Sequence, residues 1–178
     1  MREIVVACGL FAAVASGCSS DTGRSHAPLL SDPKEGPPPE NAVALPAYPQ
    51  QKDLLEFSAG PVGSHRYFID KQSILVGADG IVRYSVVVRA AGGATNTTYE
   101  GLRCATRQKR LYAVGRADGK WVESKRSEWS EVRPWAPNEY QATLFTDFFC
   151  PGRLIVRDRE AALRALQRGA SRGPVFIE

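Results

Sequence analysis

The chain has 178 residues, of which 43% are hydrophobic and 24% are charged, and its formal net charge is +4. This length suits one domain with a modest core rather than several domains. Beyond the N-terminal region no segment approaches the roughly 18 consecutive apolar residues of a transmembrane helix, which excludes a protein that crosses a membrane repeatedly.

Residues 1–17 have the pattern of a bacterial signal peptide. The run from Ile4 to Val14 is nearly all apolar but shorter than the ~20 residues that span a bilayer. The stretch "ASGC" then ends at Cys18 and resembles a lipobox, in which a signal peptidase cuts before a cysteine that carries a diacylglyceryl group. An ordinary secretory signal with an incidental cysteine is the alternative. We expect Cys18 to be lipidated and to anchor the chain without spanning the membrane.

The residue after the expected lipidation site indicates which membrane holds the anchor. Lipoproteins retained at the inner membrane of Gram-negative bacteria commonly carry an aspartate there, whereas this chain carries Ser19. This favours the cell envelope, at the periplasmic face of the outer membrane.

The region 18–51 is rich in proline, serine, glycine and acidic residues. Such a composition buries too little apolar surface to offset the conformational entropy lost on folding. We therefore predict a lipidated cysteine followed by a disordered tether over 18–51, and a single folded domain over 52–178.

Three turn signals divide the first part of the folded domain: "GADG" at 77–80, "AAGGA" at 90–94 and "RADGK" at 116–120. Each lies between runs rich in β-branched and aromatic residues, as in tight hairpins. The pattern predicts an antiparallel meander of about five strands. We place these strands near 66–76, 81–90, 95–104, 109–116 and 120–126.

The region that follows is expected to hold one or two helices. Asn138 with Gln141 resembles a capping box, and apolar residues follow at helical spacing, although alternating threonine and phenylalanine over 138–149 would also suit a strand. We favour the helix. Asp158 is expected to cap a final helix that ends before Gly169. Strands followed by helices predict an α+β fold.

Two cysteines remain in the folded domain, Cys104 and Cys150. An exported chain meets an oxidising compartment, so this pair is most simply a disulfide. A metal site is not expected, because His65 is the one histidine outside the tether and further soft ligands are missing. No cofactor is expected.

Four stretches then resemble the CNP1-like family, a group of uncharacterised exported proteins of Gram-negative bacteria. They are "DGIVRYSVVVRAAGGATNTTYEGLRC", "RLYAVGRADGKW", "SEW" and "TDFFCP". The resemblance covers about Phe57 to Gly152 and implies an exported single domain in which both cysteines are family features. It implies no activity.

No catalytic residue is predicted, because the sequence has no nucleophile elbow, zinc-protease motif or P-loop. We expect a non-catalytic envelope module that binds or scaffolds. The alternative is a small periplasmic hydrolase that uses acidic residues in a cleft. It would require His65 to converge in one pocket with two or more acids from the set Asp70, Glu100, Glu139 and Asp147.

The stretch "RQKR" supplies a possible contact with an anionic surface through Arg107, Lys109 and Arg110. We expect these residues on a solvated loop tip, where they would serve either as solubilising charge or as a contact. The partner would be an anionic envelope polymer or an acidic protein. Nucleic acid is excluded as a partner because the chain is expected outside the cytoplasm.

Overall fold

The computed structural model describes residues 36–59, 65–133 and 140–172. The contacts of the chain separate the unit Glu35–Glu178 from Met1–Lys34, and the fold below is that of the first of these units. The predicted signal peptide and Cys18 lie outside the described residues. No helix in the described ranges is long and apolar enough to cross a membrane.

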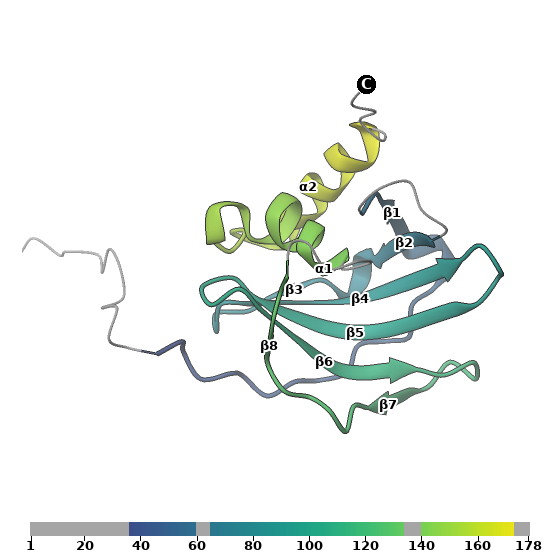
Figure 1. Cartoon of the computed structure of the whole chain (residues 1–178), viewed down its shortest axis with the longest axis horizontal. Coiled ribbons are helices and arrows are strands. Elements are labelled where there is room, and N and C mark those ends of the chain that lie inside the picture. Colours follow the sequence, from purple (N-terminus) through teal and green to yellow (C-terminus); the bar gives the residue numbers. More distant parts are fainter. Residues whose placement is uncertain (1–35, 60–64, 134–139, 173–178) are drawn as a thin grey trace, which may run out of the picture. The chain divides into compact units, whose positions relative to one another are not determined.

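The strands of the described part form one antiparallel sheet of eight strands (Figure 1). Their order is β1-β2-β4-β5-β6-β7, with β3 paired to β4 and β8 paired to β6. The strands are β1 (Leu54–Phe57), β2 (His65–Asp70), β3 (Leu75–Val76), β4 (Ile81–Ala90), β5 (Thr95–Arg103), β6 (Gln108–Gly115), β7 (Trp121–Glu123) and β8 (Ser130–Glu131). The predicted meander is confirmed, although the sheet has more strands than the five expected.

The predicted turns lie where the structure has its tight hairpins. Gly80, Gly93 and Gly119 follow β3, β4 and β6, and all have a positive φ, which glycine adopts without a steric penalty. The expected first strand is interrupted. Asp70 ends β2, and its carboxylate accepts the Gln72 backbone N–H at 3.0 Å, which starts a short 3₁₀ turn before β3.

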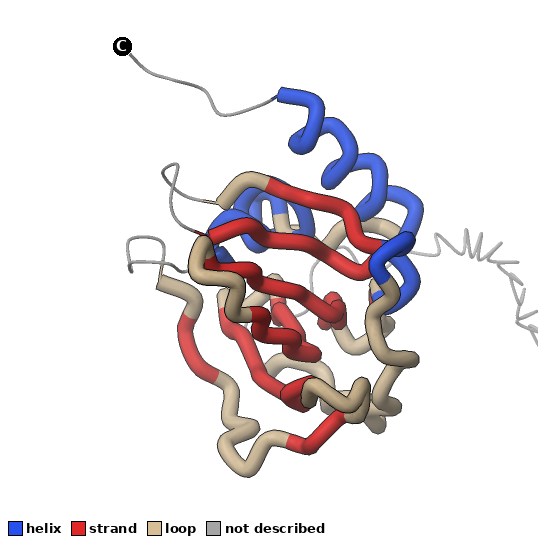
Figure 2. Tube along the Cα trace, turned by 90° about the vertical axis from the view of Figure 1, so that its right-hand side faces the viewer, coloured by secondary structure: helices blue, strands red, loops and turns tan. Residues whose placement is uncertain are grey.

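Helices cover one face of the sheet (Figures 1 and 2). They are α1 (Tyr140–Thr143), the π-helical segment η3 (Leu144–Phe149), the 3₁₀ turn η4 (Pro151–Arg153) and α2 (Arg159–Arg172). Two further 3₁₀ turns are η1 (Gln51–Asp53) and η2 (Lys71–Ser73). The predicted helical character of the described residues 140–149 is therefore confirmed, and the fold is α+β.

The last helix begins as predicted but does not end where expected. The Asp158 carboxylate accepts the Ala161 backbone N–H at 2.7 Å and so caps α2. Gly169 does not stop the helix, which continues to Arg172. A Cβ at Gly169 would lie 2.4 Å from the Phe148 ring, so this glycine allows close packing instead of ending the helix.

The main core lies between the sheet and the helices. Ile69, Val82, Leu102 and Phe149 are completely buried there. The predicted disulfide is present at the edge of this core and joins Cys104 to Cys150. It therefore ties the end of β5 to the helical layer.

The segment 36–50 lies on the other face of the sheet, away from the helices (Figure 1). Its described residues belong to the folded unit, so the predicted tether does not extend to residue 51. Trp121 donates its indole N–H to the Pro46 carbonyl at 2.9 Å. Val43 packs against a second cluster that contains Tyr99 and Tyr112. Proline in this segment is compatible with an extended chain whose side chains pack on the sheet.

Candidate functional site

The face beneath this segment contains a buried charge, Arg83. Its side chain is 2% exposed, and its guanidinium lies 2.7 Å from the Asp79 carboxylate. A buried charge of this kind is stable only with hydrogen-bonded partners of opposite charge. Asp79 also accepts the Asn41 backbone N–H at 2.9 Å. This aspartate therefore joins the turn, the sheet and the N-terminal segment.

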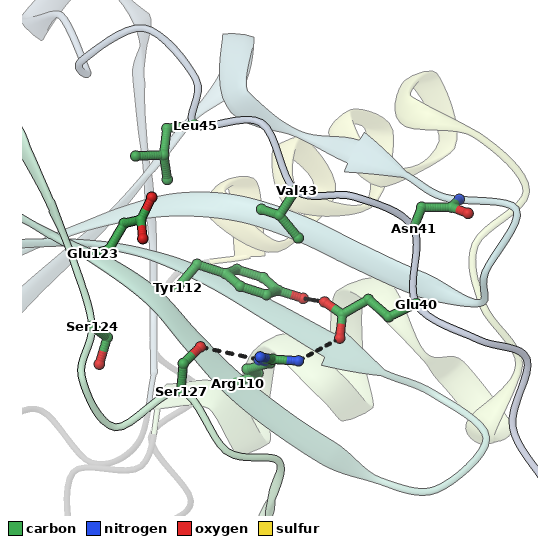
Figure 3. A pocket seen from close by; sticks show the side chains of 9 residues that line it. All are labelled: Glu40, Asn41, Val43, Leu45, Arg110, Tyr112, Glu123, Ser124 and Ser127. Carbon is green, nitrogen blue, oxygen red and sulfur yellow. Dashed lines mark hydrogen bonds and ion pairs between the residues drawn. The ribbon is translucent and has the colours of Figure 1, made fainter.

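Glu40 completes the charge balance of the face (Figure 3). Its carboxylate accepts hydrogen bonds from Arg110 at 2.6 Å and from the Tyr112 hydroxyl at 2.6 Å. The Trp129 indole donates to it at 3.1 Å, and Arg83 lies at 3.4 Å. We call these residues the Glu40 cluster: Glu40, Asp79, Arg83, Arg110, Tyr112 and Trp129. Glu40 alone connects the N-terminal segment to residues 43 to 89 positions further along the chain.

The sheet is shaped to admit the Tyr112 ring. A Cβ at Gly101 would lie 2.7 Å from the Tyr112 hydroxyl oxygen, so the missing side chain gives the ring its place. The register between β5 and β6 also shifts between Tyr99 and Glu100, which leaves Tyr112 as an extra residue in β6. Such a bulge redirects side chains locally. It turns both Tyr112 and Ala113 towards the cluster of Tyr99.

The environment perturbs the titration of the Glu40 cluster. Burial raises the pKa of Glu40, but the hydrogen bond from Tyr112 and the charge of Arg110 outweigh it, so the pKa lies below its ordinary value. The pKa of Asp79 is also lowered, because the bonds from Arg83 and the Asn41 backbone outweigh burial. Both carboxylates are therefore ionised at neutral pH.

A pocket of about 460 Å³ lies beside the Glu40 cluster (Figure 3). It is lined by Glu40, Asn41, Val43, Leu45, Arg110, Tyr112, Glu123, Ser124 and Ser127. One wall is therefore the N-terminal segment, and the other is β6 together with the end of β7 and the chain that follows it. Arg110 spans the floor, because its guanidinium also donates to the Ser127 hydroxyl at 3.0 Å. Charged donors, acceptors and hydroxyls share this pocket with apolar side chains.

The model of the CNP1-like family matches residues 34–167. The chain belongs to the CNP1-like family. The match begins before Glu40, so the segment on the sheet is part of the family domain and not a linker. No curated protein matches the chain, and no solved structure matches it.

The basic residues of "RQKR" do not form one loop tip in this CNP1-like fold. Arg107 lies in the turn with a φ of 55°, and its guanidinium lies 5.4 Å from the Phe145 ring centroid. Lys109 and Arg110 belong to β6, where successive side chains point to opposite faces. Arg110 is held by Glu40. The expectation of a loop tip was wrong, because Gln108, Lys109 and Arg110 pair with β5, and Gln108 and Lys109 also pair with β8.

The acidic residues considered for hydrolysis do not converge in the described part of the fold. Asp70 caps a turn, and Asp147 is exposed on η3. Glu100 is buried beneath the helices and does not line the pocket that contains His65. Glu139 lies outside the described residues. The arrangement that the hydrolase hypothesis requires is therefore not formed by the described members of this set.

The described residues contain no group of three or more His, Cys, Asp or Glu side chains that could hold a metal ion. Of the Glu40 cluster, only Arg110 was among the predicted site residues, and it was predicted there as a contact with an anionic surface. Glu40 stood in a proline-rich segment, and Arg83 stood among apolar strand residues. Nothing local in the sequence links them.

Proposed function

We propose that this CNP1-like chain is a lipid-anchored, non-catalytic binding protein of the bacterial cell envelope. Cys18 carries the acyl chains, and the folded domain lies at the periplasmic face of the outer membrane. The observation that carries the binding role is the pocket beside Glu40. One wall of this pocket is the segment that comes from the expected anchor, and four donors hold that wall in place.

Export is supported by the disulfide between Cys104 and Cys150. Structural disulfides persist in oxidising compartments such as the periplasm and are rare in the bacterial cytosol. The lipobox-like stretch before Cys18 supplies the route of export and the anchor.

The anchor would hold the pocket close to the membrane. Cys18 and Glu40 are 22 residues apart (40 − 18). A fully extended chain of this length spans at most roughly 75 Å. The pocket would therefore reach material within about 75 Å of the membrane that holds the acyl chains.

The lining of the pocket favours an uncharged, hydroxyl-rich ligand, such as a segment of an envelope glycan. Arg110, the one guanidinium in the lining, is already paired with the Glu40 carboxylate, and Glu123 adds a second carboxylate, so the pocket has no free positive charge that would attract an anion. Ser124 and Ser127 add hydroxyls, and the Tyr112 ring adds an apolar surface. A sugar ring presents hydroxyls at its edge and C–H groups on its faces, which match these two kinds of surface.

The direct test is a binding titration of the full chain carrying Cys18→Ala with neutral and anionic oligosaccharides, followed by NMR. We expect saturable shifts from residues 123–127 with neutral oligosaccharides. Glu123→Gln should weaken this binding at least fivefold. Glu131→Gln is the matched control, because it removes an equally exposed strand glutamate outside the pocket.

Two results would contradict the proposal. One is equal binding by the Glu123→Gln and Glu131→Gln variants. The other is a preference for anionic oligosaccharides that disappears at high salt, because this would indicate surface charge instead of the pocket.

A further inference from the structure

A second pocket lies on the helix-covered side of the sheet, where β2, β4 and β5 meet the start of α1. Its volume is about 360 Å³. Tyr67, Val88 and Tyr140 line it from the core side, and Asn96 lines it from the exposed end of β5. The Glu40 cluster is on the opposite face of the sheet, so the two pockets are independent.

Aromatic rings form one wall of this second pocket. The ring centroids of Tyr67 and Tyr140 are 5.3 Å apart, and their planes are tilted by 40°. His65 stacks beside Tyr67 at 6.3 Å. Rings of tyrosine attract cations through their electron-rich faces, and clusters of such rings bind alkylated ammonium groups.

A buried carboxylate lies behind this wall. Glu100 is 5% exposed and accepts a hydrogen bond from the Tyr140 hydroxyl at 2.5 Å. Its other donors are Thr98 at 2.8 Å, Tyr84 at 3.2 Å and Gln141 at 3.2 Å.

All four donors to Glu100 are neutral groups. Burial is the main reason that the pKa values of Tyr84 and Tyr140 lie well above the ordinary value for tyrosine, and the charge of Glu100 is the second reason. Both hydroxyls therefore keep their protons and donate.

The buried carboxylates on the two faces of the sheet differ in their partners. On the face opposite Glu100, Asp79 and Glu40 are both paired with arginine. In the part of the chain that the structure describes, the hydrogen-bond partners of Glu100 orient and solvate its carboxylate, but none of them brings a positive charge. A buried carboxylate is usually paired with a cation. Because Glu100 is only 5% exposed, its negative potential is weakly screened and extends towards the pocket.

We infer that the second pocket binds a small organic cation with an alkylated ammonium group. The cation rests on the rings of Tyr67 and Tyr140, and Glu100 supplies the compensating charge. The hydrogen bond from Tyr140 to Glu100 shifts electron density from the hydroxyl into the ring, which strengthens the attraction of that ring for a cation. Asn96 offers an amide at the open end to a polar group attached to the ammonium.

The test compares choline with its neutral isostere 3,3-dimethylbutan-1-ol. These molecules have nearly the same shape, so a difference in affinity reports the charge. The full chain carrying Cys18→Ala is titrated with each compound and followed through the amide signals of residues 94–96 by NMR. We expect choline to bind at least tenfold more tightly than the alcohol.

Two variants connect this preference to the proposed residues. Glu100→Gln keeps the shape of the side chain and removes the charge, so the preference for choline should fall to near one. Tyr140→Phe keeps the ring and removes the hydroxyl that donates to Glu100, and we expect choline to bind several-fold more weakly. If Glu100→Gln does not fold, as judged by NMR signal dispersion, the Tyr140→Phe variant and the isostere comparison decide the question.

Equal affinities of the wild-type chain for choline and the alcohol would overturn the inference. Unsaturable choline binding, or a folded Glu100→Gln variant with an unchanged preference, would also overturn it. None of these outcomes bears on the pocket beside Glu40, because that test uses oligosaccharides and residues on the opposite face.

A vesicle experiment distinguishes a lipid head group from a soluble compound as the source of the cation. The Cys18→Ala chain is sedimented with vesicles of phosphatidylcholine or phosphatidylglycerol. Recruitment to phosphatidylcholine alone, lost in Glu100→Gln, would assign the cation to a lipid head group. Binding of free choline without recruitment to vesicles would assign it to a soluble compound.

Discussion

Replacing Glu40 by glutamine should lower the free energy of unfolding by about 2–3 kcal/mol. The change keeps the size of the side chain but removes its charge. The ion pair with Arg110 is only partly buried, with side-chain exposures of 15% and 30%, so its loss costs about 1 kcal/mol. The bonds from Tyr112 and Trp129 are weakened or left unmade, at about 1 kcal/mol each.

This value is smaller than the cost of breaking a fully buried ion pair, which is about 3–5 kcal/mol. The reason is that Arg83, the most deeply buried cation of the cluster, keeps its bond to Asp79 at 2.7 Å in the variant. A loss of 2–3 kcal/mol corresponds to a fall in Tm of roughly 4–12 °C for a chain of this size.

The assay is urea unfolding of the full chain carrying Cys18→Ala, followed by tryptophan fluorescence. Glu123→Gln is the control, because Glu123 is exposed and lines the same pocket. We expect this control to differ from the parent by less than about 0.5 kcal/mol. If Glu40→Gln is no less stable than the control, the segment 36–50 is not held by its charge, and the reasoning is refuted.

Three further predictions concern the pH dependence, the disulfide and the anchor. The pKa of Glu40 is lower in the folded chain than its ordinary value. Ionised Glu40 therefore stabilises the fold at pH values above the ordinary pKa, and this contribution is lost as the pH falls through the pKa of the folded chain. Glu40→Gln should therefore lose less stability than the parent between about pH 5 and pH 3 in urea titrations; an equal loss would contradict this. Asp70 contributes with the opposite sign in both proteins, because burial raises its pKa. Replacing Cys104 and Cys150 together by alanine opens a loop with a sequence separation of 46 and should cost about 4 kcal/mol, measured by the same unfolding assay, whereas a cost below about 1 kcal/mol would argue against it. Cys18→Ala should abolish membrane association in fractionated cells and leave the fold intact, and palmitate labelling of the variant would disprove lipidation at this position.

The parts of the fold that could be predicted from the sequence depend on local signals. Asp79-Gly80 and Asp118-Gly119 restrict the chain to tight turns whatever surrounds them, so the hairpins were predicted at the right places. Asp158 caps α2 through a residue three positions further on. The disulfide followed from the compartment expected for the chain.

The candidate site could not be predicted, because the contacts that bring Glu40 to the sheet are distant in the sequence. Glu40 bonds to Arg110 and Trp129 across 70 and 89 positions. The bulge that leaves Tyr112 unpaired in β6 depends on the register with β5, and the alternation of residues within β6 does not show it. The proline-rich composition around Glu40 was interpreted as disorder, although the same composition suits an extended segment packed on a sheet.

The corrected start of the folded domain changes how the anchor would act on it. If the tether reached residue 51, it would join the folded domain at η1, next to the edge strand β1. Because Glu40 is fixed by Arg110, Tyr112 and Trp129, the chain instead leaves the domain beside the first pocket. Release of the segment between Glu40 and residue 50 would add ten residues (50 − 40) to the tether, or at most roughly 35 Å of reach. The Glu40 cluster would therefore set both the shape of the pocket and its distance from the membrane, and a variant that loosens the cluster would alter the two together.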